Sequence, residues 1–155
     1  MKSKFTNNYL PELFALNFKR NKPSMVTVNV TAQCNQQCIY CEIGKQVPSL
    51  ANDILIKEDL FWIIDQMEIE KIPKISLCGG EPFLFEGLIS VVDHAASKKI
   101  RTSITTNGMT VFKLSDEELA ILKKSGTEIN ISIDSFENEV NTITRGSSVA
   151  LVNAL

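Results

Sequence analysis

The chain has 155 residues, of which 44% are hydrophobic and 22% charged, a composition typical of one soluble globular domain. Its formal net charge of −2 gives no electrostatic case for binding nucleic acid or an anionic membrane surface. No apolar run approaches the roughly 20 residues of a membrane span, and the first residues lack the apolar stretch of a secretion signal. We therefore expect a cytoplasmic protein with no nucleic-acid or membrane partner, whose four cysteines stay reduced.

The N-terminal part of the chain divides into a lead-in segment and a first structural unit. Residues 1–24 are interpreted as the lead-in, with a short helix that begins near Pro11 and ends at Pro23. Met25–Thr31 alternates apolar and polar residues, which predicts a strand. A helix is predicted further on, because four apolar residues recur at helical spacing: Leu60, Ile63, Ile64 and Met67.

The same order of strand and helix repeats in the middle of the chain. Lys74–Cys78 predicts a second strand, and Ile100–Thr106 predicts a third. Between them, a helix is marked by apolar residues at Leu88, Val92 and Ala95. The alternation so far contains two complete strand–helix units and the start of a third.

A third helix, a fourth strand and a fourth helix complete the predicted elements. Ser115 and Glu118 form a capping box, and Gly126 is expected to end the helix that they begin. Glu128–Asp134 predicts the fourth strand. Residues 139–155 predict a fourth helix without a capping glycine, so the chain is expected to stop within that helix.

Alternating strands and helices predict right-handed crossovers and a parallel sheet, either doubly wound or part of a barrel. A parallel strand covered by helices on both faces would be apolar throughout. The fourth strand instead alternates Ile129, Ile131 and Ile133 with polar residues, and the first strand alternates its valines in the same way. One polar face favours a half-barrel that holds a ligand, so we predict an α/β fold in one domain, residues 25–155.

Unusual sequences follow each predicted strand, at the edge where parallel α/β folds build their active sites. A cysteine-rich stretch, TAQCNQQCIYCEIG, follows the first strand at residues 31–44. CGGEP (Cys78–Pro82) follows the second strand and TNG (Thr106–Gly108) the third. SIDS (Ser132–Ser135) closes the fourth. Four consecutive loops at one edge point to a shared site.

The cysteines have the spacing C-x3-C-x2-C, at Cys34, Cys38 and Cys41. Three thiolates on one short loop can hold three corners of a cubane iron–sulfur cluster, which leaves the fourth iron open to another ligand. A zinc site is the alternative, but structural zinc requires four ligands. The further donors, Cys78 and the single histidine His94, have the wrong spacing or position for that site.

The other loops carry groups suited to a polar ligand. Gly79 and Gly80 allow a sharp turn and the close approach of a ligand, and Glu81 is expected to keep a carboxylate free for an ammonium group. Ser132 and Asp134 lie two residues apart, so both point to one side of the strand, where they could hold a ribose. TNG alone is weak, because Asn-Gly is common in turns.

Together, these motifs resemble the radical S-adenosylmethionine (SAM) superfamily over residues 27–155. The resemblance implies a partial TIM barrel, incomplete here with about four βα units of the usual six. It implies two cofactors, a [4Fe–4S] cluster and SAM, and a one-electron reductant such as flavodoxin or ferredoxin. The reduced cluster would cleave SAM to a 5′-deoxyadenosyl radical, which abstracts hydrogen from a substrate.

The resemblance also assigns roles to individual residues. The cluster ligands would be Cys34, Cys38 and Cys41. The SAM-binding residues would be Tyr40 near the adenine, Gly79, Gly80 and Glu81 at the methionine ammonium, Ser132 and Asp134 near the ribose, and Thr106 and Asn107 facing SAM or substrate. Cys78 receives no ligand role and is expected to be a small packing residue.

The substrate, a peptide or a small molecule, is not specified by these motifs. The segment NTITRGSSVALVNAL (residues 141–155) resembles members that modify peptides or act as maturases. The alternatives are a non-catalytic iron–sulfur or zinc-binding module and a degenerate, truncated interaction domain. Removing the Glu81 carboxylate should abolish SAM binding and spare the cluster only in the enzyme. With four units, we expect an exposed edge on the fourth strand and weak cluster binding by the chain alone.

Overall fold

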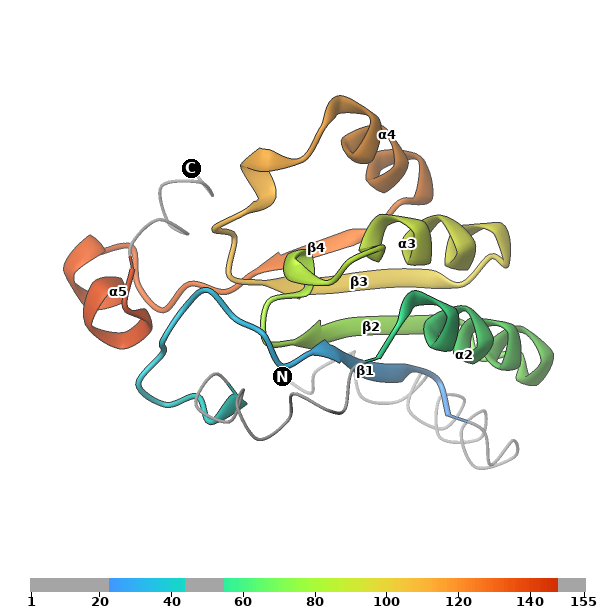
Figure 1. Cartoon of the computed structure of the whole chain (residues 1–155), viewed down its shortest axis with the longest axis horizontal. Helices are drawn as coiled ribbons and strands as arrows, with labels where there is room; N and C mark the ends of the chain where they lie inside the picture. Colours follow the sequence, from blue (N-terminus) through green and yellow to red (C-terminus); the bar gives the residue numbers. More distant parts are fainter. Residues whose placement is uncertain (1–22, 44–54, 148–155) are drawn as a thin grey trace, which may run out of the picture.

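A computed structural model describes residues 23–43 and 55–147, and these contain a parallel sheet with helices (Figure 1). The strands are β1 (Val26–Thr31), β2 (Lys74–Gly79), β3 (Arg101–Thr106) and β4 (Glu128–Ile131). The helices are α2 (Lys57–Glu70), α3 (Leu88–Ser97), α4 (Asp116–Ser125) and α5 (Asn138–Arg145), with short 3-10 turns η3 (Pro82–Leu84) and η4 (Val111–Lys113). The predicted lead-in helix lies outside the described residues.

The four strands pair in sequence order, β1-β2-β3-β4, and every pair is parallel. Leu77 of β2 pairs with Val28 of β1 on one side and with Ile104 of β3 on the other. This register brings the apolar residues of neighbouring strands to the same face. The prediction of a parallel α/β sheet is confirmed, as an incomplete partial barrel of four units.

Helices α2, α3 and α4 cover one face of the sheet, and α5 lies beyond the carboxyl ends of the strands (Figure 1). The core lies between the sheet and these helices. Fully buried side chains there include Leu60 and Ile64 of α2, Ile75 of β2 and Ile104 of β3. The predicted stripe on α2 is buried at Leu60, Ile64 and Met67, while Ile63 packs at the edge of the core. Sequence periodicity therefore identified the buried face.

Helix α4 begins and ends where its local sequence predicts. The Ser115 hydroxyl accepts a hydrogen bond from the Glu118 backbone N–H, and the Glu118 carboxylate accepts one from the Ser115 backbone N–H. Gly126 ends the helix in the left-handed conformation, at φ 64°. Both signals depend on neighbouring residues alone, which is why they can be read from the sequence.

Two predicted boundaries near the end of the described residues are wrong. Strand β4 ends at Ile131 rather than Asp134, because the backbone N–H groups of Asp134 and Ser135 donate to the Asn141 side chain and do not continue the strand. Helix α5 ends at Arg145, since Gly146 adopts a left-handed conformation (φ 75°) and caps it. The helix therefore does have a capping glycine. The remaining predicted helical residues, 148–155, lie outside the described part of the chain. Among the helices of the described part, none is long and apolar enough to cross a membrane.

Candidate functional site

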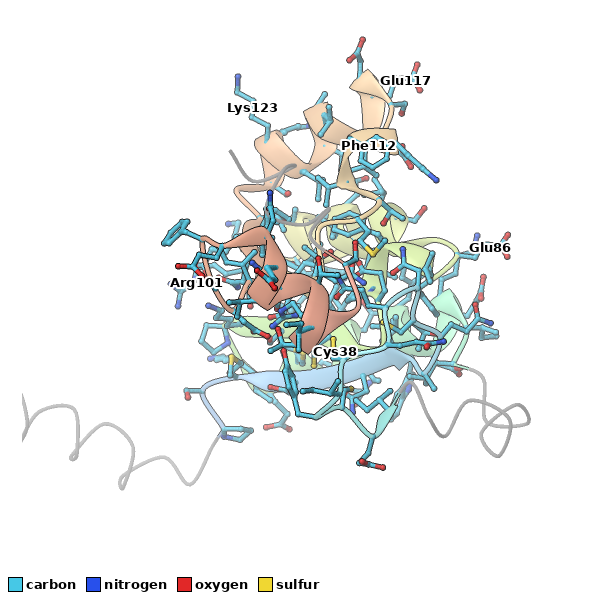
Figure 2. All side chains as sticks on the ribbon, turned by 90° about the vertical axis from the view of Figure 1, so that its left-hand side faces the viewer. Cys38, Glu86, Arg101, Phe112, Glu117 and Lys123 are labelled. Carbon is cyan, nitrogen blue, oxygen red and sulfur yellow. The ribbon has the colours of Figure 1, made fainter. Side chains whose placement is uncertain are left out.

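The carboxyl ends of the strands surround a cavity of about 660 Å³, at the end of the molecule that faces the viewer in Figure 2. It is lined by nine of the eleven residues predicted for the site: Cys34, Cys38, Tyr40, Cys41, Gly79, Gly80, Thr106, Asn107 and Ser132. Glu81 and Asp134 are not among its lining residues. The four motifs predicted to share one edge of the sheet are therefore brought together.

The cysteine loop between β1 and α2 presents three free, half-buried thiols to this cavity. Backbone hydrogen bonds shape the loop: the N–H of Gln36 donates to the Cys34 Sγ at 3.4 Å, and the N–H of Cys41 donates to the Cys38 carbonyl at 3.1 Å. Burial raises the pKa of the Cys38 thiol, which the nearby Arg145 guanidinium opposes. A bound metal would have to displace the proton of this thiol.

In residues 23–43 and 55–147, no three His, Cys, Asp or Glu side chains converge as the ligands of a single metal ion do. A single zinc ion would draw its sulfur ligands to about 2.3 Å from one point. A cubane cluster instead takes each cysteine on a different iron atom, so its thiolates are spread over the wall of a larger cavity. Three free thiols from one loop that line a single cavity are a donor set that fits a cluster.

The paired glycines after β2 let the cysteine loop pack directly on the strand end. A Cβ atom on Gly80 would lie 2.1 Å from the backbone oxygen of Gln33, and one on Gly79 would lie 2.5 Å from that of Thr31. Gly79 also has φ +125°, which L side chains rarely adopt. Since glycine has no side chain, the atoms that these two residues expose to the cavity belong to the backbone.

Glu81 differs from its expected role, because its carboxylate is fully buried and already hydrogen-bonded. Its Oε1 accepts from the Thr106 hydroxyl at 2.7 Å and from the Phe83 N–H at 3.1 Å. Its Oε2 accepts from the backbone N–H of Asn107 at 2.7 Å. The carboxylate thus ties the end of β2 to the end of β3. Glu81→Ala would disturb this support, so it cannot test SAM binding alone.

Asn107 extends that support to the cysteine loop. Its side-chain Nδ2 donates to the Asn35 Oδ1 at 2.7 Å and lies 3.8 Å from the Cys34 Sγ. Its Oδ1 accepts from the Met109 N–H, which fixes the orientation of the amide. Thr106 and Asn107 were predicted to face SAM or substrate. In the structure both line the cavity, and their hydrogen bonds hold the site together from within.

Tyr40, Asp134 and Arg145 form a second tie between the cysteine loop and the last unit. The Tyr40 hydroxyl donates to the Asp134 carboxylate at 2.9 Å, and the Arg145 Nη2 lies 2.6 Å from the Asp134 Oδ1. Desolvation and this hydrogen bond raise the pKa of Tyr40 to about 12. Burial would raise the pKa of Asp134, but hydrogen bonds from Thr144, Arg145 and Tyr40 outweigh it and lower that pKa. Asp134 therefore already has partners at the position predicted to hold a ribose.

Helix α5 completes this tie. The buried Asn141 Oδ1 accepts from the backbone N–H groups of Asp134 and Ser135, which turns the chain after β4. The Ile39 N–H donates to the Thr144 carbonyl at 2.9 Å, so the cysteine loop rests on the last turn of α5. Sequence reasoning missed Asn141 because nothing in its neighbours marks an asparagine that will be buried.

Several further residues line the cavity without having been predicted, including Gln36, Thr105 and Arg145. The Arg-Gly pair at residues 145–146 was a readable helix-end signal. Cys78, expected to be a packing residue, also lines the cavity, and its thiol lies 3.1 Å from the Asn29 Oδ1. Burial raises the pKa of Cys78, which keeps that thiol protonated.

Comparison with known proteins agrees with this geometry. The chain is 30% identical over 132 residues to a GTP 3',8-cyclase of Lactiplantibacillus plantarum, covering 82% of this chain and 39% of the cyclase. It is 37% identical over 123 residues to the corresponding cyclase of Geobacter sulfurreducens, covering 76% and 36%. The chain thus spans about two fifths of the length of the curated relatives that it matches.

Solved structures share the fold. Streptococcus suis SuiB bound to S-adenosylmethionine matches with a TM-score of 0.68 at 20% identity, over 95% of this chain and 34% of SuiB. BtrN in complex with AdoMet and 2-DOIA matches with a TM-score of 0.54 at 26% identity, over 70% of this chain and 44% of BtrN. The sequence profile of the Radical SAM superfamily matches residues 28–153. This chain, with its cysteine loop and glycine pair at one edge of a parallel sheet, belongs to the radical SAM superfamily.

Proposed function

We propose that the chain forms the cofactor-binding part of a radical SAM enzyme. The observation that carries this proposal is the shared cavity: three thiols from one loop line it together with the exposed backbone of Gly79 and Gly80. Its volume of about 660 Å³ lies within the range of small-molecule and cofactor sites. Bound in such a site, a [4Fe–4S] cluster supplies the electron that cleaves SAM to a 5′-deoxyadenosyl radical.

Different residues of the chain would bind the cluster and the methionine part of SAM. Cys34, Cys38 and Cys41 hold three irons of the cluster, and the absence of a fourth thiol from the motif leaves one iron for SAM. The backbone of Gly79 and Gly80, which lines the cavity, binds the methionine ammonium, because peptide carbonyls accept hydrogen bonds.

The remaining polar residues position SAM and substrate. Tyr40 lies beside the adenine, and Ser132 and Asp134 lie near the ribose. The Asp134 carboxylate is hydrogen-bonded to Tyr40 and Arg145, so it would contact the ribose while it keeps these two partners. Thr106 and Asn107 face SAM or substrate from the end of β3. Glu81 has an indirect role: its carboxylate accepts hydrogen bonds from Thr106 and Asn107 and holds both residues in place.

The substrate is proposed to be a peptide. SuiB, whose fold this chain shares, has been solved bound to a precursor peptide, SuiA. The lining of the cavity is compatible with an uncharged substrate, since Arg145 is its only charged residue within the described part of the chain. The GTP 3',8-cyclase relatives supply a second candidate, a purine nucleotide. A triphosphate would require further cations outside the described cavity lining.

Anaerobic reconstitution with iron and sulfide tests the cofactor assignment. The wild-type chain should retain iron and sulfide in equal amounts, at less than one cluster per chain because the exposed edge of the fourth strand weakens binding by this chain alone. Once reduced, the cluster that it does retain should form 5′-deoxyadenosine from SAM. Cys34→Ser, Cys38→Ser and Cys41→Ser should each lose most of the iron, because serine is a poor ligand for the cluster. Cys78→Ser is the matched control and should retain it, since this thiol lies in the same cavity but outside the motif.

Three results would contradict the proposal. The first is a wild-type chain that retains neither iron nor sulfide. The second is loss of metal from the Cys78→Ser variant as complete as that from the loop variants, which would indicate a site with four thiol ligands. The third is a stoichiometric cluster that yields no 5′-deoxyadenosine and whose electron paramagnetic resonance (EPR) spectrum does not respond to SAM. That outcome would favour a non-catalytic iron–sulfur module.

A further inference from the structure

Gln36 is a buried residue within a polar loop. Its side chain is only 5% exposed, whereas its neighbours Asn35 and Gln37 are exposed. Its Nε2 has no hydrogen-bond partner among the residues that the structure describes. Buried polar side-chain atoms nearly always have such a partner, so an unpaired amide in the wall of a cofactor cavity points to a group that it would meet there.

Two of the three motif sulfurs lie against this one residue. The Gln36 backbone N–H donates to the Cys34 Sγ at 3.4 Å. Its side-chain Oε1 accepts a hydrogen bond from the Cys38 thiol at 3.7 Å. The carboxamide is therefore held beside the Cys38 sulfur, with Oε1 toward the sulfur and Nε2 on the other arm of the same planar group.

A cysteine sulfur that binds iron has lost its proton and can only accept hydrogen bonds. The Oε1 of Gln36 would then face a sulfur that no longer donates to it. Rotation about the last side-chain bond exchanges the two arms of a carboxamide at little steric cost, because oxygen and NH₂ have almost the same size. The exchange points Nε2–H at the Cys38 Sγ, which gives the unpaired nitrogen a partner, and turns Oε1 to the place that Nε2 leaves.

We propose that Gln36 donates an N–H···S hydrogen bond to the Cys38 sulfur of the bound cluster and thereby raises its reduction potential. This inference rests on the proposed function, since it requires a cluster on the cysteine loop. The reduced cluster carries one more negative charge than the oxidised one, so a donor at its sulfur stabilises the reduced form more. Gln36 also reaches Cys34 through its backbone, and that contact survives any substitution of the side chain.

Two variants separate this role from simple packing. Gln36→Met removes the donor and keeps an unbranched side chain of similar length. Gln36→Glu keeps the shape, but replaces the donor with a negative charge. A packing role predicts that these variants change the stability of the loop without a consistent effect on potential. A donor role predicts a potential that falls in both variants, and further in Gln36→Glu.

The experiment is a redox titration of the reconstituted full chain, followed by the EPR signal of the reduced cluster. We expect the equilibrium constant for one-electron reduction to fall about three- to tenfold in Gln36→Met, where tenfold corresponds to about 59 mV. A larger fall is expected in Gln36→Glu. Gln33→Met is the matched control, the same change three residues earlier in the same loop, at an exposed side chain that does not line the cavity. Its potential should equal that of the wild type.

The results separate the two proposals. A wild-type chain without a cluster would contradict the proposed function itself. A wild-type cluster with unchanged or higher potentials in both Gln36 variants would overturn the present inference alone. Should one variant fail to retain a cluster, the other decides the question. Should both fail while Gln33→Met retains its cluster, Gln36 would be a packing residue of the loop, which also overturns the inference.

Discussion

Replacing Glu81 with glutamine should destabilise the fold and loosen the cysteine loop, although the side chain keeps its shape. The carboxylate is fully buried and accepts three hydrogen bonds, from the Thr106 hydroxyl and from two backbone N–H groups. In Glu81→Gln the remaining oxygen can keep the two donors on the Oε1 side. The new NH₂ group then faces the backbone N–H of Asn107, which also donates.

The expected cost follows from that one position. A buried donor left without a partner costs about 1–3 kcal/mol, and a second donor placed opposite it adds to that cost. We therefore expect the free energy of unfolding to fall by about 2–4 kcal/mol. Since small domains are stable by about 5–15 kcal/mol, the variant should still fold. Because Asn107 also bonds Asn35, the cysteine loop should lose part of its support.

Urea denaturation followed by far-ultraviolet circular dichroism measures this loss, and iron retention after reconstitution measures the effect on the loop. Glu86→Gln is the control: it is the same substitution five residues later, at an exposed side chain, and should change the free energy of unfolding by no more than about 0.5 kcal/mol. If Glu81→Gln and Glu86→Gln are equally stable and retain equal iron, the buried carboxylate does not support the site.

Two other substitutions test the geometry and the electrostatics of the site. Gly80→Ala should lower the free energy of unfolding more than Gly126→Ala, and only Gly80→Ala should lower iron retention. The reason is that a Cβ on Gly80 would lie 2.1 Å from a backbone atom, whereas a Cβ on Gly126 would meet nothing within 4 Å. Equal losses of unfolding free energy in the two variants would contradict this. The lowered pKa of Asp134 means that its contribution to stability is present above its unfolded pKa and is lost as the pH falls through the lower folded value. Between about pH 5 and pH 3 the wild type should therefore lose more unfolding free energy than Asp134→Asn, and parallel curves in urea denaturation would show that the tie to Tyr40 and Arg145 contributes nothing.

Local signals in the sequence were sufficient for most of the fold. Helix α4 could be placed because its caps at Ser115 and Gly126 act within a few residues of the helix ends. Strand β4 was predicted too long because its end is decided by Asn141, a side chain from the next helix that bonds the backbone at Asp134. A contact of that kind leaves no pattern in the strand itself.

The same difference between local sequence signals and contacts between distant residues applies to the candidate site. The cysteines and the glycine pair were found because their residue types and spacing are unusual. The burial of Glu81 was not found, since a glutamate in a turn is normally solvated and only the packing of β2 against β3 encloses it. Gln36 was missed for a related reason: it stands among exposed polar residues, and its burial follows from how the loop folds over the cavity.

The contacts between the cysteine loop and later parts of the chain also bear on how the protein is made. Tyr40 bonds Asp134, 94 residues later, and Asn107 reaches Cys34 across 73 residues. A ribosome that has synthesised only the cysteines has therefore not yet made the partners that shape their loop. During translation the thiols are therefore present long before the cavity that they line is complete. Pausing within residues 45–145 would expose reactive thiols that the finished chain holds half-buried.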